Sequence, residues 1–309
     1  MAVKYAVLPE SGTHKLAPWR EELTRSVTDG GGVVVEPADA EALIWIANNH
    51  QGLSAVLEAA PQIRWVQLPS AGVERWMDVI DDERLWTCAK GVYAEPVAEH
   101  ALALALGGMR GIARYARATK WTDPYGINLL GAQVCILGGG DIATTLLRLL
   151  APFGTDITVV RNRVAPMDGA DHVVGPDQLH AGVAGAQLVV LALALTPATT
   201  GIIDAAALRA MRRDAWLVNV ARGQHVVTDD LVAALSREEI GGAALDVTDP
   251  EPLPEGHPLW SLPNAVITPH LGNTPEMGFR LFTERITTNV ARYGRGEEPL
   301  GLVDVELGY

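Results

Sequence analysis

The chain has 309 residues, of which 48% are hydrophobic and 20% charged, a composition typical of a globular protein that is too long for one compact core. We therefore expect two domains. The net charge is −13 with only 24 Lys and Arg, so the long-range field repels nucleic acid and anionic membrane surfaces. The sequence thus excludes a binder that relies on a basic patch, and it predicts no nucleic-acid or membrane partner.

Cysteine usage and the absence of targeting patterns indicate a cytoplasmic protein. The N-terminal residues lack the pattern of a secretory signal, and no later apolar run is long enough to span a bilayer. The longest candidate, AEHALALALGGM, is interrupted by Gly107 and Gly108 and predicts a buried helix. Cys88 and Cys135 lie in apolar, strand-like runs, where a thiol is usually a small buried side chain.

The first hundred residues alternate short apolar runs with amphipathic stretches, which is the pattern of β-α units that form a parallel sheet. Strand-like runs occur at KYAVLP, GGVVVEP, ALIWIA, RWVQLP and LWTCA, and residues 53–59 have helical character. They predict a small open sheet. Pro96 suits the first turn of a helix, and the apolar run after it continues towards Arg117. This predicts one long helix between two domains.

A second series of strands begins at residue 132. Its apolar runs are QVCILGGG, DITVVRN, AQLVVLAL, DAWLVNVA, GGAALDV and NAVITPH. Six buried strands with helices between most of them fit a doubly wound dinucleotide-binding fold. Residues 274–293 are helical in pattern and should pack back on the first domain. The sequence thus predicts an α/β protein with a Rossmann domain at residues 97–278 and a smaller, flavodoxin-like parallel-sheet substrate domain at residues 1–96 and 279–309.

A glycine-rich turn follows the first strand of this second series. Gly138, Gly140 and Ala143 form the pattern G-x-G-x-x-A. A tight turn needs the first glycine, and close approach to a pyrophosphate needs the second. The helix that begins with Asp141 and Ile142 offers free N–H groups to an anion. A glycine triplet alone is as often structural, but the strand before it and the helix after it favour a dinucleotide site.

The next strand ends in Arg161, Asn162 and Arg163. An acidic residue at this place would accept hydrogen bonds from the adenosine ribose of NAD. Here the carboxylate that would repel a 2′-phosphate is missing, and two guanidinium groups that could bind one stand close by. We expect NADP(H) as the preferred cofactor, with NAD(H) possible. The alternative is that the arginines form a solvated loop face.

Polar residues follow three later strands, in the motifs VNVARG, ALDVTDPEPLP and VITPHLG. Arg222 can hold a carboxylate with two parallel hydrogen bonds and orient a 2-keto acid. His270 can donate a proton to the carbonyl oxygen as a hydride reaches the carbon. Glu251 can hydrogen-bond the imidazole and favour its protonated form. Arg222 or Glu251 alone would more often be structural, but the combination predicts a ketone reductase. No metal site is predicted.

With these motifs the chain resembles the D-2-hydroxyacid dehydrogenase family over nearly its whole length. The resemblance implies that Arg222, Glu251 and His270 are the catalytic set. It also implies that EPVAEHALALAL is a helix that crosses between domains and that LALTPATTGIID lies along the cofactor. The further cofactor-side residues that it implies are Leu195, Thr196, Pro197, Val220, Ala221, Asp246 and Gly272, with Asp246 near the nicotinamide.

The resemblance extends to the substrate side of the family. LPSAGVE resembles the loop whose amides hold the substrate carboxylate, and it implies Ser70, Ala71 and Gly72 as substrate residues, against an ordinary strand-to-helix turn. The details are nearest to glyoxylate and hydroxypyruvate reductases: the ending VDVELGY, the basic residues after the second Rossmann strand, and Trp45. Trp45 is a candidate wall of the substrate pocket, although residue type alone favours a place in the core.

Three positions depart from the family pattern, namely Ala143, Arg161 and Asn273. No regulatory domain follows the last helix, so an amino-acid-controlled phosphoglycerate dehydrogenase is not expected. The resemblance further implies a homodimer formed through the cofactor domain, with residues 115–130 as an arm.

The sequence therefore predicts an NAD(P)-dependent dehydrogenase that interconverts a small 2-keto acid, of the glyoxylate or hydroxypyruvate type, and the D-2-hydroxy acid. An alternative is a catalytically weak NAD(P)-sensing interaction protein of the same fold, but such a protein would not need all three catalytic residues. A methyltransferase with a similar glycine turn would leave the arginine, glutamate and histidine unexplained.

Overall fold

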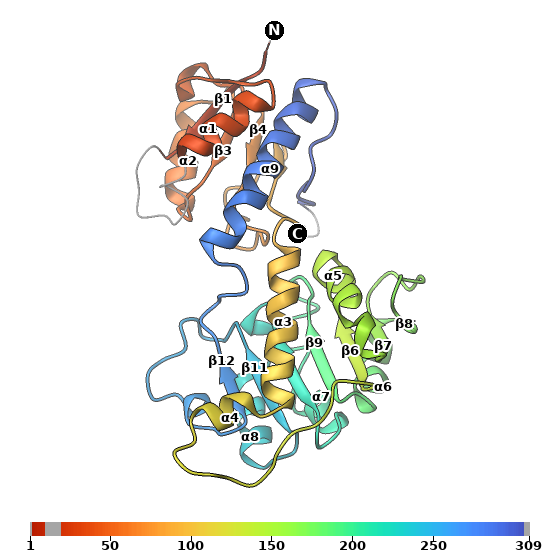
Figure 1. Ribbon diagram of the computed structural model, residues 1–309. Coiled ribbons are helices and arrows are strands. Elements are labelled where there is room, and N and C mark those ends of the chain that lie inside the picture. The colour runs from red at the N-terminus through yellow and green to blue at the C-terminus, as the bar shows by residue number, and fades with distance from the viewer. Residues whose placement is uncertain (1, 10–19, 306–309) are drawn as a thin grey trace. The chain divides into compact units, whose positions relative to one another are not determined.

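The computed structural model describes residues 2–9 and 20–305. The chain divides into two compact units, Met1–Tyr93 with Asn273–Tyr309, and Ala94–Gly272 (Figure 1). The sequence predicts boundaries after residues 96 and 278. These predicted boundaries lie a few residues after the observed divisions, inside the helices Ala94–Met109 and Pro275–Gly294. The substrate-binding and dinucleotide-binding roles of the two units stay predictions.

The first unit is built on a five-stranded parallel sheet with the order β2-β1-β3-β4-β5. Its strands are β1 (Lys4–Leu8), β2 (Val33–Val34), β3 (Ala42–Trp45), β4 (Trp65–Gln67) and β5 (Leu85–Thr87). Its helices are α1 (Arg20–Asp29), α2 (His50–Ala59) and α9 (Pro275–Gly294). The five strand-like runs of the sequence are thereby confirmed as strands, with β2 reduced to two residues.

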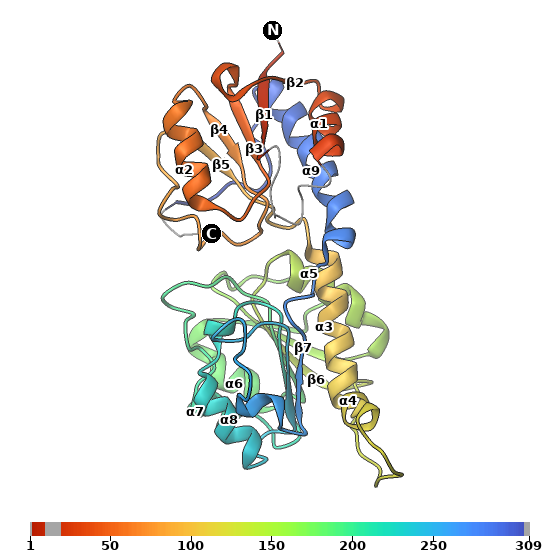
Figure 2. The same ribbon diagram turned by 90° about the vertical axis from the view of Figure 1, so that its left-hand side faces the viewer.

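Helices cover both faces of this first sheet. Figure 2 shows α2 on one face and α1 with α9 on the other. The α1 and α9 side packs Leu23, Phe282 and Ile286 against Tyr5. The α2 side packs Leu53 and other apolar side chains against the opposite face of the sheet. Because α9 supplies one of these two cores, the end of the chain completes the first unit, as the helical pattern of residues 274–293 indicates.

The second unit contains a seven-stranded parallel sheet with the order β12-β11-β10-β9-β6-β7-β8. Its strands are β6 (Gln133–Leu137), β7 (Asp156–Val160), β8 (His172–Val174), β9 (Leu188–Leu191), β10 (Trp216–Asn219), β11 (Gly242–Leu245) and β12 (Ala265–Ile267). The six predicted strands are all present. The seventh, β8, was not predicted, because three residues at a sheet edge carry too short an apolar run to stand out.

Two layers of helices enclose this second sheet. The apolar side chains of α3 (Ala94–Met109) and α5 (Asp141–Leu150) pack in one core with one face of the sheet. Those of α6 (Leu179–Ala184), α7 (Ala205–Ala210) and α8 (Thr228–Ser236) pack in a second core with the other face. All four residues of each of the central strands β9, β10 and β11 are buried. Burial on both faces explains why these strands are continuous apolar runs rather than alternating ones.

The prediction of one long helix that continues towards Arg117 is wrong. The helix α3 ends at Met109, and Gly111 adopts φ 64° before a separate short helix, α4 (Ile112–Ala116). A residue in the left-handed region ends the regular hydrogen-bond pattern of a right-handed helix, and glycine adopts that region at little cost. No helix among residues 2–9 and 20–305 is both long and apolar enough to cross a membrane. Cys88 and Cys135 are buried free thiols.

Candidate active site

The carboxyl ends of the strands in the second sheet carry most of the candidate residues. Gly138 follows β6, Arg161 follows β7, Arg222 follows β10, and His270 follows β12. All of these strands are parallel, so the segments after them leave from one edge of the sheet. Strands β6 and β9 are neighbours although two strands separate them in the chain, which makes their carboxyl ends the switch point where such sheets bind ligands.

The glycine turn after β6 has room for an anion. Gly138 has φ 109°, and a Cβ added there would lie 2.1 Å from the carbonyl oxygen of Ala192, so this position requires glycine. Gly140 directly precedes α5, and a Cβ added to it would meet no atom within 4 Å. The open space therefore lies at a helix N-terminus, whose free N–H groups attract negative charge. The turn fits the pyrophosphate of a dinucleotide.

We expect Gly138→Ala to destabilise the second unit by about 3 kcal/mol or more, because the added methyl group overlaps the backbone of Ala192 and the residue must keep a positive φ. Gly140→Ala is the matched variant. It should change the free energy of unfolding by less than about 0.5 kcal/mol, yet weaken binding of a nicotinamide dinucleotide, because its methyl group enters the open space. Urea unfolding and fluorescence titration measure the two effects. Equal stability losses in both variants would contradict this description of the turn.

The end of β7 places an arginine directly beside the glycine turn. A Cβ added to Gly139 would lie 2.7 Å from Cδ of Arg161, so the arginine side chain packs on the backbone of the turn. One guanidinium nitrogen of Arg161 also donates to the sulfur of Met167 at 3.5 Å. Asn162 and Arg163 are exposed. The two guanidinium groups thus lie at the end of the strand where an NAD-specific fold would carry a carboxylate.

His270 and Glu251 form a direct contact. Nδ1 of His270 lies 2.7 Å from a carboxylate oxygen of Glu251, as the sequence predicts. Half of the His270 side chain is exposed, so the imidazole is open to a ligand. Its backbone has φ 54°, in the left-handed region that residues other than glycine rarely adopt. Strain of this kind persists only where surrounding contacts enforce it, and such residues cluster at functional sites.

Asp246, the middle residue of the motif LDV, makes the contacts that hold the backbone of His270. Its carboxylate accepts hydrogen bonds from the Thr268 hydroxyl at 2.6 Å and from the amides of Leu271 and Gly272, each at 2.8 Å. The Asp246 carbonyl accepts the amide of His270 at 2.8 Å. Asp246 is almost completely buried, and burial alone would raise its pKa. Hydrogen bonds from His100, Thr268 and the two amides outweigh burial and hold the pKa at about 2.

A depressed pKa in the folded state means that ionised Asp246 stabilises the fold above its ordinary pKa of 3.8, and that this contribution is lost as the pH falls towards 2. We expect Asp246→Asn to lower the free energy of unfolding by about 2 kcal/mol near neutral pH, with a smaller difference from wild type near pH 3. Urea unfolding at several pH values measures this. Asp168→Asn, at an exposed aspartate of the same unit, is the control. A difference that does not vary with pH would contradict the assignment.

Hydrogen bonds hold both the main chain and the side chain of Arg222. Its carbonyl accepts the side-chain amide of Asn219 at 2.8 Å, and one of its guanidinium nitrogens donates to the carbonyl of Ala221 at 2.7 Å. A Cβ added to the next residue, Gly223, would lie 2.0 Å from the carbonyl group of Thr248. Glycine is therefore required there, because the segment of Arg222 packs on the segment after β11 that leads to Glu251. The structure thus joins the segments of all three predicted catalytic residues at one sheet edge.

The remaining predicted cofactor residues lie in the segments after β9, β10, β11 and β12. Leu195, Thr196 and Pro197 belong to a turn in which the Thr196 amide donates to the Thr199 hydroxyl at 2.8 Å. Val220 and Ala221 are nearly buried and lead directly to Arg222. Gly272 contacts the Asp246 carboxylate, as described above. The predicted position of Asp246 near the nicotinamide stays a prediction, since its carboxylate is occupied by the His270 segment.

Of the predicted substrate residues of the first unit, Ser70, Ala71 and Gly72 follow β4, and Trp45 is the last residue of β3. The Ser70 hydroxyl donates to the carbonyl of Gly72 at 2.7 Å and accepts the indole N–H of Trp76 at 2.9 Å, so it stabilises its own turn. The Ser70 carbonyl accepts the amide of Ala89 at 2.8 Å. Trp45 is 3% exposed and packs in the core on the α2 side. Its indole N–H has no hydrogen-bond partner among the described residues.

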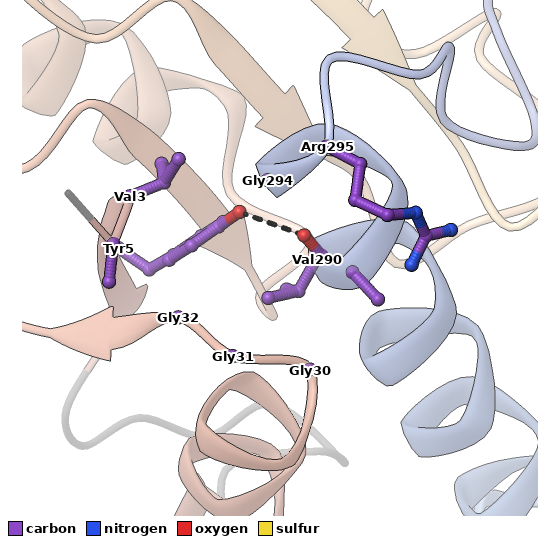
Figure 3. A pocket seen from close by; sticks show the side chains of 10 residues that line it. Val3, Tyr5, Gly30, Gly31, Gly32, Val290, Gly294 and Arg295 are labelled. Atoms are coloured by element: carbon purple, nitrogen blue, oxygen red, sulfur yellow. Dashed lines mark hydrogen bonds between the residues drawn. The ribbon is translucent and has the colours of Figure 1, made fainter.

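A pocket of about 240 Å³ lies elsewhere in the first unit (Figure 3). It is bordered by the start of β1, the glycines that precede β2 and the end of α9. The Tyr5 hydroxyl donates to the carbonyl of Val290 at its wall, at 3.5 Å. Arg295 reaches its rim and forms a bidentate pair with Glu297. None of the predicted site residues lines it.

The sequence analysis missed several polar residues that support the site. His100 of α3 lies 3.0 Å from the Thr268 hydroxyl and 3.2 Å from the Asp246 carboxylate. Asn219 and His225 both bind the main chain of Arg222. His100 and Asn219 are polar residues in an otherwise apolar helix and strand, which is the sequence signal that they offer, whereas His225 follows a polar residue and offers none. In the part of the chain that the structure describes, no group of three or more His, Cys, Asp or Glu side chains could hold a metal ion.

The second unit is a doubly wound parallel sheet with an anion-binding turn at its switch point. A histidine and an arginine lie at the same edge of this sheet. Together with the family match given next, these features define a nicotinamide-dependent oxidoreductase. Residues 100–272 match the family model of the D-isomer specific 2-hydroxyacid dehydrogenase NAD binding domain. This match covers more than half of the chain. The protein belongs to the D-isomer specific 2-hydroxyacid dehydrogenase family.

Similar proteins cover the chain to different extents. The "uncharacterized protein in proB 3′region" of Corynebacterium melassecola is 38% identical over 93% of this chain and 97% of its own length. The glyoxylate/hydroxypyruvate reductase A of Yersinia enterocolitica is 35% identical over 56% of this chain and 55% of its own. A D-isomer specific 2-hydroxyacid dehydrogenase from Xanthobacter autotrophicus, solved in complex with NADPH and MES, aligns with a TM-score of 0.85 at 26% identity, over 100% of both chains.

Proposed function

We propose that the protein reduces small 2-keto acids of the glyoxylate or hydroxypyruvate type to D-2-hydroxy acids, with NADPH as the preferred hydride donor. The observation that carries this proposal is the contact of 2.7 Å between His270 and Glu251 at the sheet edge that also bears the glycine turn. The name of the Yersinia relative supports the substrate class, and the NADPH bound to the Xanthobacter structure supports the cofactor.

Each of the three residues has a distinct task in this reaction. A nicotinamide bound at the glycine turn would supply the hydride for the carbonyl carbon. Arg222 binds the substrate carboxylate through two hydrogen bonds and fixes which face of the carbonyl is presented. The Glu251 carboxylate accepts the Nδ1–H of His270, which leaves Nε2–H directed at the carbonyl oxygen. The electron pair of the C=O bond moves to that oxygen, the oxygen takes the Nε2 proton, and the imidazole is left neutral.

The segment of Ser70, Ala71 and Gly72 in the first unit is proposed to bind the substrate carboxylate. Among the described residues, none accepts a hydrogen bond from the amides of Ala71 or Gly72. Two neighbouring amides without a protein acceptor suit a carboxylate oxygen. Trp45 is proposed to contribute to the apolar wall of the substrate site, where its indole N–H could meet a polar atom of the ligand.

The choice of cofactor is proposed to depend on Arg161 and Arg163. We expect Arg161→Ser and Arg163→Ser each to raise the KM for NADPH roughly tenfold and to leave the KM for NADH within about twofold, because only NADPH carries the 2′-phosphate. Steady-state kinetics with both cofactors measures this. Arg237→Ser is the control, since it removes one exposed arginine whose nearest partner is Glu239 at 3.4 Å. Equal losses with NADPH and NADH would contradict a role in 2′-phosphate binding.

The proposal as a whole is tested by mixing the purified protein with NADPH and each member of a panel of 2-keto acids. The absorbance of reduced nicotinamide should fall fastest with glyoxylate or hydroxypyruvate, and chiral analysis of a product longer than glycolate should give the D-isomer. No oxidation of NADPH above background across the panel, at a concentration where titration shows that NADPH binds, would overturn the proposal.

The active form is proposed to be a cytoplasmic homodimer that uses residues 115–130. Trp121 is 99% exposed and Leu130 is 67% exposed in this segment. Large apolar side chains in one exposed segment indicate a protein interface. Sedimentation equilibrium should therefore give twice the mass of one chain. A single-chain mass at the concentrations used for kinetics would contradict the dimer.

A further inference from the structure

His225 lies at the end of the short 3-10 helix η5 (Gly223–His225), three residues after Arg222, and is completely buried. Buried histidines need hydrogen-bond partners for both ring nitrogens, and here both have them. Nδ1 lies 3.2 Å from the main-chain nitrogen of Arg222. Nε2 lies 3.2 Å from the carbonyl oxygen of Ala194, in the segment after β9. The ring thus contacts the segment of Arg222, which is predicted to bind the substrate, and the segment of Ala194, which is predicted to lie along the dinucleotide.

The partners determine which nitrogen carries the proton. The Ala194 carbonyl can only accept, so we assign the proton to Nε2. With this assignment Nδ1 accepts the N–H of Arg222. Nδ1 is also 3.0 Å from the carbonyl of Arg222, but that carbonyl already accepts the side-chain amide of Asn219. A ring with its proton on Nε2 therefore fits both the Ala194 carbonyl and the Arg222 amide.

One end of this link is the predicted substrate-binding arginine. The N–H of Arg222 donates to His225, its carbonyl accepts from Asn219, and the next residue, Gly223, packs on the main chain of Thr248. A main chain held on both of its polar groups gives the side chain a fixed origin. The direction of the guanidinium therefore depends on the imidazole of His225.

The other end of the link is the segment that is predicted to lie along the dinucleotide. Ala194 directly precedes Leu195, Thr196 and Pro197. The Ala194 carbonyl also accepts the Thr199 hydroxyl at 2.8 Å, and this hydroxyl accepts the amide of Thr196 at 2.8 Å. A change at Ala194 would therefore be transmitted to the turn that carries the predicted cofactor residues.

We propose that His225 is a positioning residue whose two ring nitrogens hold two parts of the site: Nδ1 fixes the main chain of Arg222 on the substrate side, and Nε2 fixes the cofactor-side segment at Ala194. This inference rests on the proposed function, because it assigns Arg222 to the substrate and the Ala194 segment to the cofactor. Loss of one of the two hydrogen bonds should therefore weaken the binding of one ligand and spare the other.

Two substitutions separate the two ends of the link. In His225→Asn, the amide oxygen takes the place of Nδ1 and can still accept the N–H of Arg222, but nothing reaches Ala194. In His225→Gln, the amide nitrogen takes the place of Nε2 and can still donate to Ala194, but the contact with Arg222 is lost. His225→Phe keeps the ring shape and removes both hydrogen bonds. His180→Gln, at an exposed position of α6, is the control.

We expect His225→Asn to raise the Kd for NADPH roughly fivefold and to leave the KM for the keto acid within about twofold. His225→Gln should do the reverse, with the KM for the keto acid raised roughly fivefold or more at nearly unchanged kcat. His225→Phe should show both effects. Fluorescence titration with NADPH, steady-state kinetics at saturating NADPH, and thermal unfolding of each variant measure these quantities.

The proposal is overturned if Asn and Gln give the same pattern, or if the variants lower Tm while both ligand constants stay at wild-type values, as for a merely structural histidine. A wild-type protein that binds NADPH but reduces no 2-keto acid would instead refute the proposed function. Titration with NADPH would then still test the link to Ala194, because Asn must weaken this binding and Gln must not.

Discussion

His270→Ala is expected to lower kcat by roughly a hundredfold to ten-thousandfold, because the variant has no proton donor for the carbonyl oxygen. The Kd for NADPH should stay within about twofold of wild type, since the imidazole is proposed to contact the substrate rather than the dinucleotide. Stopped-flow or steady-state assays with saturating NADPH measure the first quantity, and fluorescence titration measures the second. The separation of turnover from cofactor binding is what distinguishes an acid catalyst from a residue that merely supports the fold.

Two further variants make this prediction sharper. Glu251→Gln keeps the size of the side chain and removes the carboxylate that lies 2.7 Å from Nδ1, so kcat should fall by a smaller factor, roughly tenfold to a hundredfold. His180→Ala, at an exposed histidine of the same unit, should leave kcat unchanged. If His270→Ala retains more than about a tenth of wild-type kcat, another group must protonate the substrate.

Arg222→Met should lower kcat/KM for 2-keto acids by roughly a hundredfold to ten-thousandfold, because two hydrogen bonds between charged groups are lost. Arg222→Lys should recover only part of this loss. A lysine keeps the charge but cannot form the two parallel bonds that orient the carboxylate. Kinetics with a 2-keto acid and with the matching ketone that lacks the carboxylate measures the specific loss, since only the acid can use the guanidinium.

The control for this prediction is Arg237→Met, which removes an arginine that is 70% exposed on its side chain. It should leave kcat/KM unchanged. The contradictory outcome for Arg222 is an equal loss for the acid and for the ketone without a carboxylate. That result would mean that Arg222 supports the edge of the sheet, for example through its contact with Ala221, rather than the substrate.

Local patterns in the sequence were sufficient to predict most of the fold. The runs at β6, β9, β10 and β11 are buried on both faces, so the apolar pattern alone identifies them. The glycine turn was also predicted, because the spacing of its glycines between an apolar strand and a helix is visible in the sequence, although the contact of Gly138 with Ala192 is not. The extension of α3 towards Arg117 was wrong, because the residues after Gly111 are good helix formers while one left-handed glycine decides the break.

The support of the site could not be predicted from the sequence. The ring of His225 binds Ala194, 31 residues away, and His100 binds Thr268, 168 residues away. Neither pairing has a signature in spacing, because each depends on which strands become neighbours. Asp246 illustrates the same limit. The family resemblance implied a place for Asp246 near the nicotinamide, but only the structure shows that its carboxylate binds the segment of His270.

The left-handed backbone of His270 has a consequence for the timing of the reaction. Four hydrogen bonds from residues 268–272 to Asp246 keep the main chain of His270 in place before any ligand binds. The entropy lost in ordering the proposed proton donor is therefore spent once, when the chain folds, and not in each turnover. The rigid donor leaves the substrate and the dinucleotide as the components whose motions must be restricted at the moment of hydride transfer.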